Sequence, residues 1–183
     1  MVDPRIYEMF CEIGRDLYEA NMISSHGGNL SVRLGDRVVI KRRGAQLGRL
    51  KPHDLIETRL DKNDSGVALA STELLVHRTV YLSTPALAIC HCHPRTAIAF
   101  SLSRDELVPI DNDASYLLKK VPVVTEEFAS GTPQMAHKVA EALKNYKIIM
   151  LRGHGSFATG QTLDEAFFWS STLEESCQIE LAV

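Results

Sequence analysis

The 183-residue sequence lacks three features that would assign it to large classes of protein. It has four cysteines, too few for the disulfide framework of a small secreted domain, so we expect free thiols at Cys11, Cys90, Cys92 and Cys177. It has no apolar run approaching the roughly 18 residues of a membrane span, and we expect no membrane association. Its formal net charge is only −3, which argues against a broad nucleic-acid-binding surface.

The amino-terminal segment also lacks the basic and apolar character of a signal peptide. Residues 1–20 form an amphipathic pattern that includes acidic side chains. We therefore expect a cytoplasmic protein in a reducing environment. Because 45% of the residues are hydrophobic and the chain is long enough for a full core, we expect residues 1–183 to form a single domain.

Helical and strand patterns interleave along the chain. Asp3 and Pro4 read as the N-cap and first position of a helix whose apolar residues recur to Leu17. Strands are predicted at LSVRL and RVVIK, which flank a Gly35-Asp36 hairpin turn, and at DLIETRL, LAICHCH, VPVV and KIIML. Four further helices are predicted to begin near Ser71, Pro94, Thr132 and Thr162. The polar segment from about 103 to 120 is expected to be a loop.

This order of elements indicates the fold class. Helices that alternate with strands along one chain predict an α/β domain of three layers, with helices on both faces of a central sheet. The early hairpin argues against a purely parallel sheet. We therefore expect a largely antiparallel or mixed sheet.

The stretch AICHCHPRTA, residues 88–97, alternates histidine with cysteine in an apolar run. Because strand side chains alternate between faces, His91 and His93 should point one way, and Cys90 and Cys92 the other. The two histidine Cα atoms would lie about 6.6 Å apart, so both imidazoles can reach one metal ion. The cysteines lack zinc-finger spacing and are expected to pack as small apolar groups. Two hydrogen-bonded histidines would give the same pattern, so this stretch alone leaves metal binding open.

Two other stretches carry candidate ligands. His154 stands in RGHGS, where flanking glycines let the backbone approach a ligand and expose the imidazole. Glu73 lies at the start of a predicted helix, where the helix dipole favours a carboxylate even without a metal. Three histidines and one carboxylate match a tetrahedral Zn²⁺ site with an exchangeable position.

The remaining histidines are weaker candidates. His77 lies one turn after Glu73 and should share its helix face. His26, in the turn-like SSHGG stretch, can contact substrate but is expected to be a surface residue, as are His53 and His137.

Several motifs in the same order resemble the class II aldolase/adducin family, most of all its L-fuculose-1-phosphate aldolase branch. They are GGNLSVR, the segment ending in Arg43-Gly44, STELLVHRTVY, HCHP and RGHGSFATG with the helix that follows. The resemblance extends from about Tyr7 to Leu181.

The resemblance implies a set of site residues. Zinc would be held by His91, His93 and His154, and Glu73 would be a ligand in the resting site and then the acid/base group. A phosphate-binding set would comprise Gly28, Asn29, Arg43, Gly44, Ser71 and Thr72. The family also implies a homotetramer with fourfold symmetry and sites between subunits.

The chemistry of these phosphate-set residues is consistent with anion binding. Gly27 and Gly28 let backbone N–H groups approach a phosphate, and Asn29 adds an amide donor. Ser71 and Thr72 lie at a predicted helix N-terminus, where free N–H groups and the dipole favour an anion. A turn glycine or a plain helix cap is the structural alternative at each position.

Three departures from the family pattern concern the substrate end of the site. Arg43 stands where the family often has a small hydroxyl residue; it can pair with phosphate directly or belong to a solvated basic face with Lys41, Arg42 and Arg49. Where the aldolases carry a tyrosine acid in a later loop, an ungapped count places Asp113, and Tyr116 is the nearest tyrosine. A second tyrosine, in the tail of longer relatives, has no counterpart in this sequence.

The resemblance, together with these residues, implies a zinc-dependent aldolase acting on a small phosphorylated sugar. It would reversibly cleave a ketose 1-phosphate into dihydroxyacetone phosphate and a small aldehyde such as lactaldehyde. Glu73 favours an aldolase, whereas Asp113 is more typical of the pentulose-5-phosphate 4-epimerases on the same scaffold. A thio-pentulose-phosphate dehydratase and a non-catalytic adducin-like binding module are further alternatives.

Overall fold

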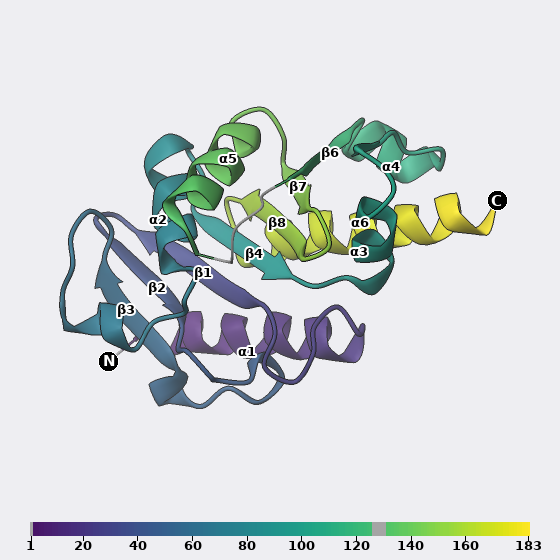
Figure 1. The fold of residues 1–183 in the computed structure, drawn as a ribbon. Coiled ribbons are helices and arrows are strands. Elements are labelled where there is room, and N and C mark those ends of the chain that lie inside the picture. The colour runs from purple at the N-terminus through teal and green to yellow at the C-terminus, as the bar shows by residue number, and fades with distance from the viewer. Residues whose placement is uncertain (1, 126–130) are drawn as a thin grey trace.

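The computed structural model describes residues 2–125 and 131–183, in which eight strands form one sheet (Figure 1). The strand order is β3-β2-β1-β4-β8-β7-β6-β5. The strands are β1 (Asn29–Leu34), β2 (Arg37–Lys41), β3 (Leu55–Arg59), β4 (Ala88–Cys92), β5 (Glu106–Leu107), β6 (Val121–Val124), β7 (Ile148–Leu151) and β8 (Gly155–Gly160). Neighbouring strands pair antiparallel, except that β6 and β7 are parallel. The predicted mixed, largely antiparallel sheet is confirmed.

Helices cover both faces of this sheet. They are α1 (Pro4–Glu19), α2 (Leu74–Ser83), α3 (Arg95–Ser101), α4 (Asn112–Leu117), α5 (Pro133–Leu143) and α6 (Leu163–Ala182), with 3₁₀ turns η1 (Leu47–Arg49), η2 (Pro52–Asp54) and η3 (Ser65–Ala68). One apolar cluster contains Phe10 of α1 and Leu173 of α6, together with side chains of α3 and α4. The other contains Val80 of α2 and Val139 of α5. These two helices lie side by side on the opposite face of the sheet (Figure 1). The three-layer α/β/α expectation is therefore confirmed.

The helix starts follow the capping residues read from the sequence. The Asp3 carboxylate accepts the N–H of Arg5 at 2.8 Å, and Pro4 occupies the first turn of α1. At α6 the Thr162 hydroxyl accepts the N–H of Glu165 at 3.1 Å, and the Glu165 carboxylate accepts the N–H of Gln161 at 2.7 Å. These side chains satisfy backbone donors that have no partner inside the helix.

Two local predictions were wrong, and one strand was not predicted. The segment expected to be a loop contains β5 and α4, and Asp111 caps α4 by accepting the N–H of Ala114 at 2.8 Å. Helix α2 begins at Leu74 rather than near Ser71, with Glu73 at the N-cap position. Residues 155–160 form β8, a strand that the glycine-containing GSFATG pattern did not suggest.

Two findings concern the cysteines and the apolar character of the helices. All four cysteines are free, and Cys90, Cys92 and Cys177 are buried. Among the helices described, none is long and apolar enough to cross a membrane.

Candidate active site

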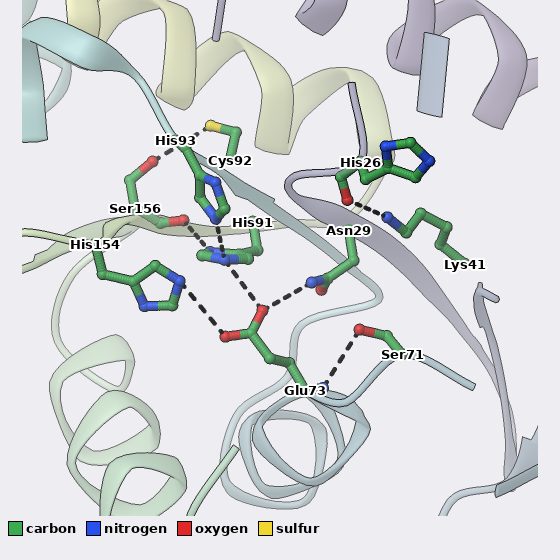
Figure 2. A network of polar contacts seen from close by, with 10 residues as sticks. All are labelled: His26, Asn29, Lys41, Ser71, Glu73, His91, Cys92, His93, His154 and Ser156. Atoms are coloured by element: carbon green, nitrogen blue, oxygen red, sulfur yellow. Dashed lines mark hydrogen bonds and ion pairs between the residues drawn. The ribbon is translucent and has the colours of Figure 1, made fainter. Parts of the chain in front are cut away.

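Four side chains from separate parts of the chain meet at one end of the central strands (Figure 2). His91 lies near the end of β4 and His93 just beyond it, while His154 lies in the turn between β7 and β8. Glu73 reaches them from the N-terminus of α2. The candidate ligand nitrogens of the three histidines all lie within 4.8 Å of one another.

The orientation of His91 is fixed by its neighbours. Its Nδ1 lies 2.9 Å from the carbonyl oxygen of Ser156, and because a carbonyl can only accept, Nδ1 carries the proton. The ring also stacks on Phe157, with centroids 4.0 Å apart. The unprotonated Nε2 of the neutral ring is therefore directed at the cluster, as in metal-ligating histidines.

The Nε2 atom of His91 faces two other groups of types that bind metal ions, an imidazole and a carboxylate. It lies 3.0 Å from Nε2 of His93 and 3.0 Å from Oε2 of Glu73. The tautomer of His93 decides how this gap is filled: a hydrogen on its Nε2 would bridge the two rings, whereas an unprotonated Nε2 would leave room for a cation that all three groups can bind. A proton on His91 Nε2 is disfavoured, since burial and the neighbouring imidazoles hold its pKa well below the usual value. The site therefore fits a metal ion.

The carboxylate of Glu73 is held on one oxygen only. The amide of Asn29 donates to Oε2 at 2.7 Å, whereas Oε1 lies 3.9 Å from Nε2 of His154 and has no hydrogen-bond partner in the described part of the chain. Burial raises the pKa of Glu73, although Asn29 and Lys41 oppose this rise. A carboxyl group whose pKa is raised by burial is suited to proton transfer.

Burial also keeps the other two histidines of the cluster, His93 and His154, in the neutral form. Burial lowers the pKa of His93 to about 4 and also lowers that of His154. Neutral imidazoles are the form that binds metals. The cluster could thus hold a divalent ion across the neutral pH range.

The predicted alternation of faces along β4 is confirmed. Cys90 and Cys92 belong to the apolar cluster on the α1 and α6 side, away from the histidines. The Cys92 sulfur lies 3.4 Å from the hydroxyl of Ser156 (Figure 2). The cysteines are packing residues here, as expected.

Two glycines allow the backbone to pass close to His93. A Cβ on Gly155 would lie 2.3 Å from the carbonyl oxygen of Cys92 and 2.9 Å from the His93 ring. A Cβ on Gly27 would lie 2.9 Å from Nδ1 of His93. Neither position has room for a side chain.

A pocket of about 240 Å³ opens beside the cluster, and all six residues of the phosphate-binding prediction line it. Its lining consists of His26, Gly27, Gly28, Asn29, Lys41, Arg43, Gly44, Ser71, Thr72, Glu73, His93 and His154. Gly28 and Gly44 have positive φ angles of 68° and 75°, which glycine adopts without strain. The pocket therefore joins the candidate metal ligands to an end that contains these two glycines and the cations Lys41 and Arg43.

Lys41 was missed as a pocket residue and wrongly assigned to a solvated basic face. It is only 4% exposed, and its ammonium donates to the carbonyl oxygen of His26 at 3.0 Å (Figure 2). Burial lowers its pKa to about 8, against the opposing effects of Glu73 and Asp54. The hairpin pairs Ile40 with Ser31, so Lys41 is the next residue of β2 at the end of the hairpin where β1 begins after Gly28.

Arg43 and His26 lie at the outer part of the pocket. Both are exposed, as the sequence suggested for His26. His26 contacts Ser25 and Gln46 through its two ring nitrogens, at 2.9 Å and 3.2 Å. Each can therefore meet a ligand that enters this pocket.

The other sequence candidates lie elsewhere. His53 and His137 are exposed outside the histidine cluster, as expected. His77 shares the α2 face of Glu73 but is fully buried and contacts Ser31. Asp113 and Tyr116 are exposed on α4 and do not line the pocket of their own chain.

Comparisons with known proteins agree with this geometry. The sequence model of the family "Class II Aldolase and Adducin N-terminal domain" matches residues 8–181. An L-fuculose phosphate aldolase of Methanococcus maripaludis is 29% identical over 171 residues, with 93% of each chain covered. A 3-oxo-tetronate 4-phosphate decarboxylase of Haemophilus influenzae is 31% identical over 98% of this chain and 88% of that protein.

The similarity extends to solved structures. The crystal structure of L-fuculose-1-phosphate aldolase from Thermus thermophilus superposes with a TM-score of 0.93 at 41% identity, covering 98% of this chain and 94% of that one. Fold, site geometry and sequence thus agree: the chain belongs to the class II aldolase and adducin family.

Proposed function

We propose that the chain is a zinc-dependent aldolase that reversibly cleaves a ketose 1-phosphate of the L-fuculose 1-phosphate type. The products would be dihydroxyacetone phosphate and a small aldehyde such as lactaldehyde. The observation that carries the proposal is the convergence of the His91 Nε2 lone pair with His93 and Glu73 beside a cation-lined pocket. We also propose that residues 1–183 act as one catalytic domain.

The metal-binding part of the proposal rests on four side chains. His91, His93 and His154 would hold the ion, and the Glu73 carboxylate, whose Oε1 has no hydrogen-bond partner among the described residues, would complete the resting set. A bound divalent ion supplies Lewis acidity, which stabilises by several kcal/mol the negative charge that develops on a substrate carbonyl.

Glu73 would move the proton. As the bond between the two fragments breaks, its electron pair stays on the carbon next to the carbonyl, and the Glu73 carboxyl donates a proton to that carbon. In the reverse direction the carboxylate takes this proton back. Asn29 keeps Oε2 in place during the transfer, because it donates to that oxygen at 2.7 Å. Proton transfer by a positioned group contributes typically about 10²–10⁴-fold.

The phosphate would lie at the other end of the pocket. Backbone N–H groups around Gly28 and Gly44 and the hydroxyls of Ser71 and Thr72 provide donors, and Lys41 provides a charge. Arg43 can add a bidentate contact from the outer rim. Holding the phosphate fixes the reacting carbons relative to Glu73.

A second acid/base group must take the hydroxyl proton of the departing aldehyde fragment. We propose that a neighbouring copy of the chain in a homotetramer supplies it, since Asp113 and Tyr116 of α4 are exposed and do not line the pocket of their own chain. Tyr116 is 81% exposed in the single chain, as expected of a side chain that meets a partner. Val108 and Ile110, both 57% exposed, add apolar surface just before α4.

A decarboxylase acting on a phosphorylated 3-oxo acid is a second candidate. A relative of this chain carries that name at 31% identity. The chemistry is closely related, because loss of carbon dioxide leaves the same kind of charge beside a carbonyl. Arg43 adds a cation that suits a substrate with both a phosphate and a carboxylate.

Product analysis tests the proposal directly. Purified protein with measured metal content is incubated with L-fuculose 1-phosphate, with a pentulose 5-phosphate, and with a 3-oxo-tetronate 4-phosphate. Release of dihydroxyacetone phosphate from the first substrate, lost on chelation and restored by zinc, is the expected result. Carbon dioxide release from the third would identify the decarboxylase, and interconversion of the second the epimerase. Protein that binds no metal and converts none of them would be the non-catalytic module.

A further inference from the structure

A row of buried polar contacts joins strand β1 to helix α2 behind the histidine cluster. The first is the Asn29 amide on Glu73, at 2.7 Å. The next joins the Ser31 hydroxyl to Nδ1 of His77, at 2.6 Å, and the same hydroxyl lies 2.7 Å from the hydroxyl of Tyr81. Ser31 therefore connects two successive turns of α2 to the strand that carries Asn29.

The spacing of these residues follows from the two periodicities. Alternate residues of a strand share a face and lie about 6.6 Å apart, while residues four apart on a helix lie about 6 Å apart along its axis. Positions 29 and 31 of β1 thus match positions 73 and 77 of α2. A further contact, from the Arg33 guanidinium to the backbone oxygen of Tyr81 at 2.7 Å, continues the row.

These contacts lie where water cannot replace them. Ser31 and His77 are 0% exposed and Tyr81 is 1% exposed. Burial lowers the pKa of His77 to about 3, so its ring is neutral and has one nitrogen that accepts. A buried donor or acceptor that loses its partner destabilises the fold, because no water can take the partner's place. The helix and the strand are therefore held at the separation that keeps these hydrogen bonds.

His77 also reaches the cluster from a second direction. Its ring stands edge-on to Phe157, with centroids 6.1 Å apart, and the Phe157 ring stacks on His91. The side chain of His77 therefore lies between the strand contact and the ring that supports a candidate ligand.

Glu73 depends on this anchoring because of its place in α2. It is the N-cap residue, its side chain makes no capping hydrogen bond, and its Oε2 accepts from the amide of Asn29. The direction of Oε1 is then set by where the first turn of α2 lies relative to β1. Ser31 fixes the position of α2 relative to β1 through its contacts with His77 and Tyr81, one and two helical turns after Glu73.

We propose that Ser31, His77 and Tyr81 are positioning residues that hold the Glu73 carboxylate in register with the three histidines. They act through the helix and the strand, without touching the substrate. The proposal rests on the function proposed above for Glu73, but zinc affinity tests it independently of turnover.

The test compares Ser31→Ala and Tyr81→Phe with a matched control, Thr58→Val. Thr58 is also 0% exposed, and its hydroxyl contacts the same helix through Arg78 at 3.2 Å, but it does not reach Ser31 or Glu73 by any contact described. Zinc affinity is measured by competition with a chromophoric chelator, the free energy of unfolding by urea titration, and kcat and KM with the active ketose phosphate. Ser31→Ala should weaken zinc binding and lower kcat, each about tenfold, as for other residues behind metal ligands. KM should stay within about twofold.

Tyr81→Phe should give smaller changes in the same direction, and Thr58→Val should lose stability with zinc affinity and kcat within twofold of the wild type. If Ser31→Ala does not fold, Tyr81→Phe decides the question alone. Variants that lose only stability, as the control does, would overturn the proposal. Wild-type protein without aldolase activity would instead refute the proposed function. The zinc affinities of the variants would still test whether Ser31 positions Glu73.

Discussion

The buried ammonium of Lys41 makes a quantitative prediction for substrate binding. Its pKa is lowered to about 8, so it is charged at pH 7 and about a tenth charged at pH 9. If the charged form binds the substrate phosphate, KM should rise roughly tenfold between pH 7 and pH 9, in proportion to the charged fraction lost. Lys41→Met removes a hydrogen bond to a charged group, about 1.5–3 kcal/mol, or roughly 10- to 150-fold in KM.

Lys41→Arg is the matched control, because a guanidinium stays charged throughout this range. Initial rates are measured from pH 6.5 to 9.5 with the phosphorylated substrate, and KM is separated from kcat at each pH. The arginine variant should bind substrate with a KM that does not rise between pH 7 and 9, and the methionine variant should show a raised KM at every pH. An unchanged rise of KM with pH in either variant would refute the assignment of the titrating group to Lys41.

Four further predictions concern the cluster and its assembly. Glu73→Gln should retain zinc by elemental analysis but lose about 10²–10⁴-fold in kcat, since the amide cannot move a proton; near-normal turnover would place proton transfer elsewhere. His93→Ala should lose zinc and activity together, and a metal-replete, active variant would contradict its role as a ligand. Gly155→Ala should unfold at lower urea concentration than the wild type, because the added Cβ would meet the Cys92 carbonyl. Mixing refolded Glu73→Gln subunits with subunits changed at both Asp113 (to Asn) and Tyr116 (to Phe) should restore activity, unless each site is complete within one chain.

Local chemistry made part of this structure predictable. Asp3 and Thr162 fixed two helix starts, because their side chains accept backbone N–H groups that nothing else in the helix can satisfy. The alternation of His91 with Cys90 and Cys92 fixed which side chains face the site, since a strand has a period of two residues.

What the sequence did not indicate depends on tertiary context. β8 contains two glycines and gains its stability from pairing with β4 and β7 on both sides, which no local pattern reveals. Lys41 reads as a solvated charge, but the fold buries its stem under the turn that carries His26. The short α4 rests on Ala114 and Leu118, too few apolar residues to give a helical period.

The contrast between the two ends of the pocket has an evolutionary consequence. Around Gly155 the backbones of adjacent strands leave no space for even a methyl group, so substitutions there disrupt the sheet itself. The rim at His26 and Arg43 is built from exposed side chains on loops, where exchanges cost little folding energy. We therefore expect substitutions at the rim to be tolerated more readily than substitutions beside the histidine cluster.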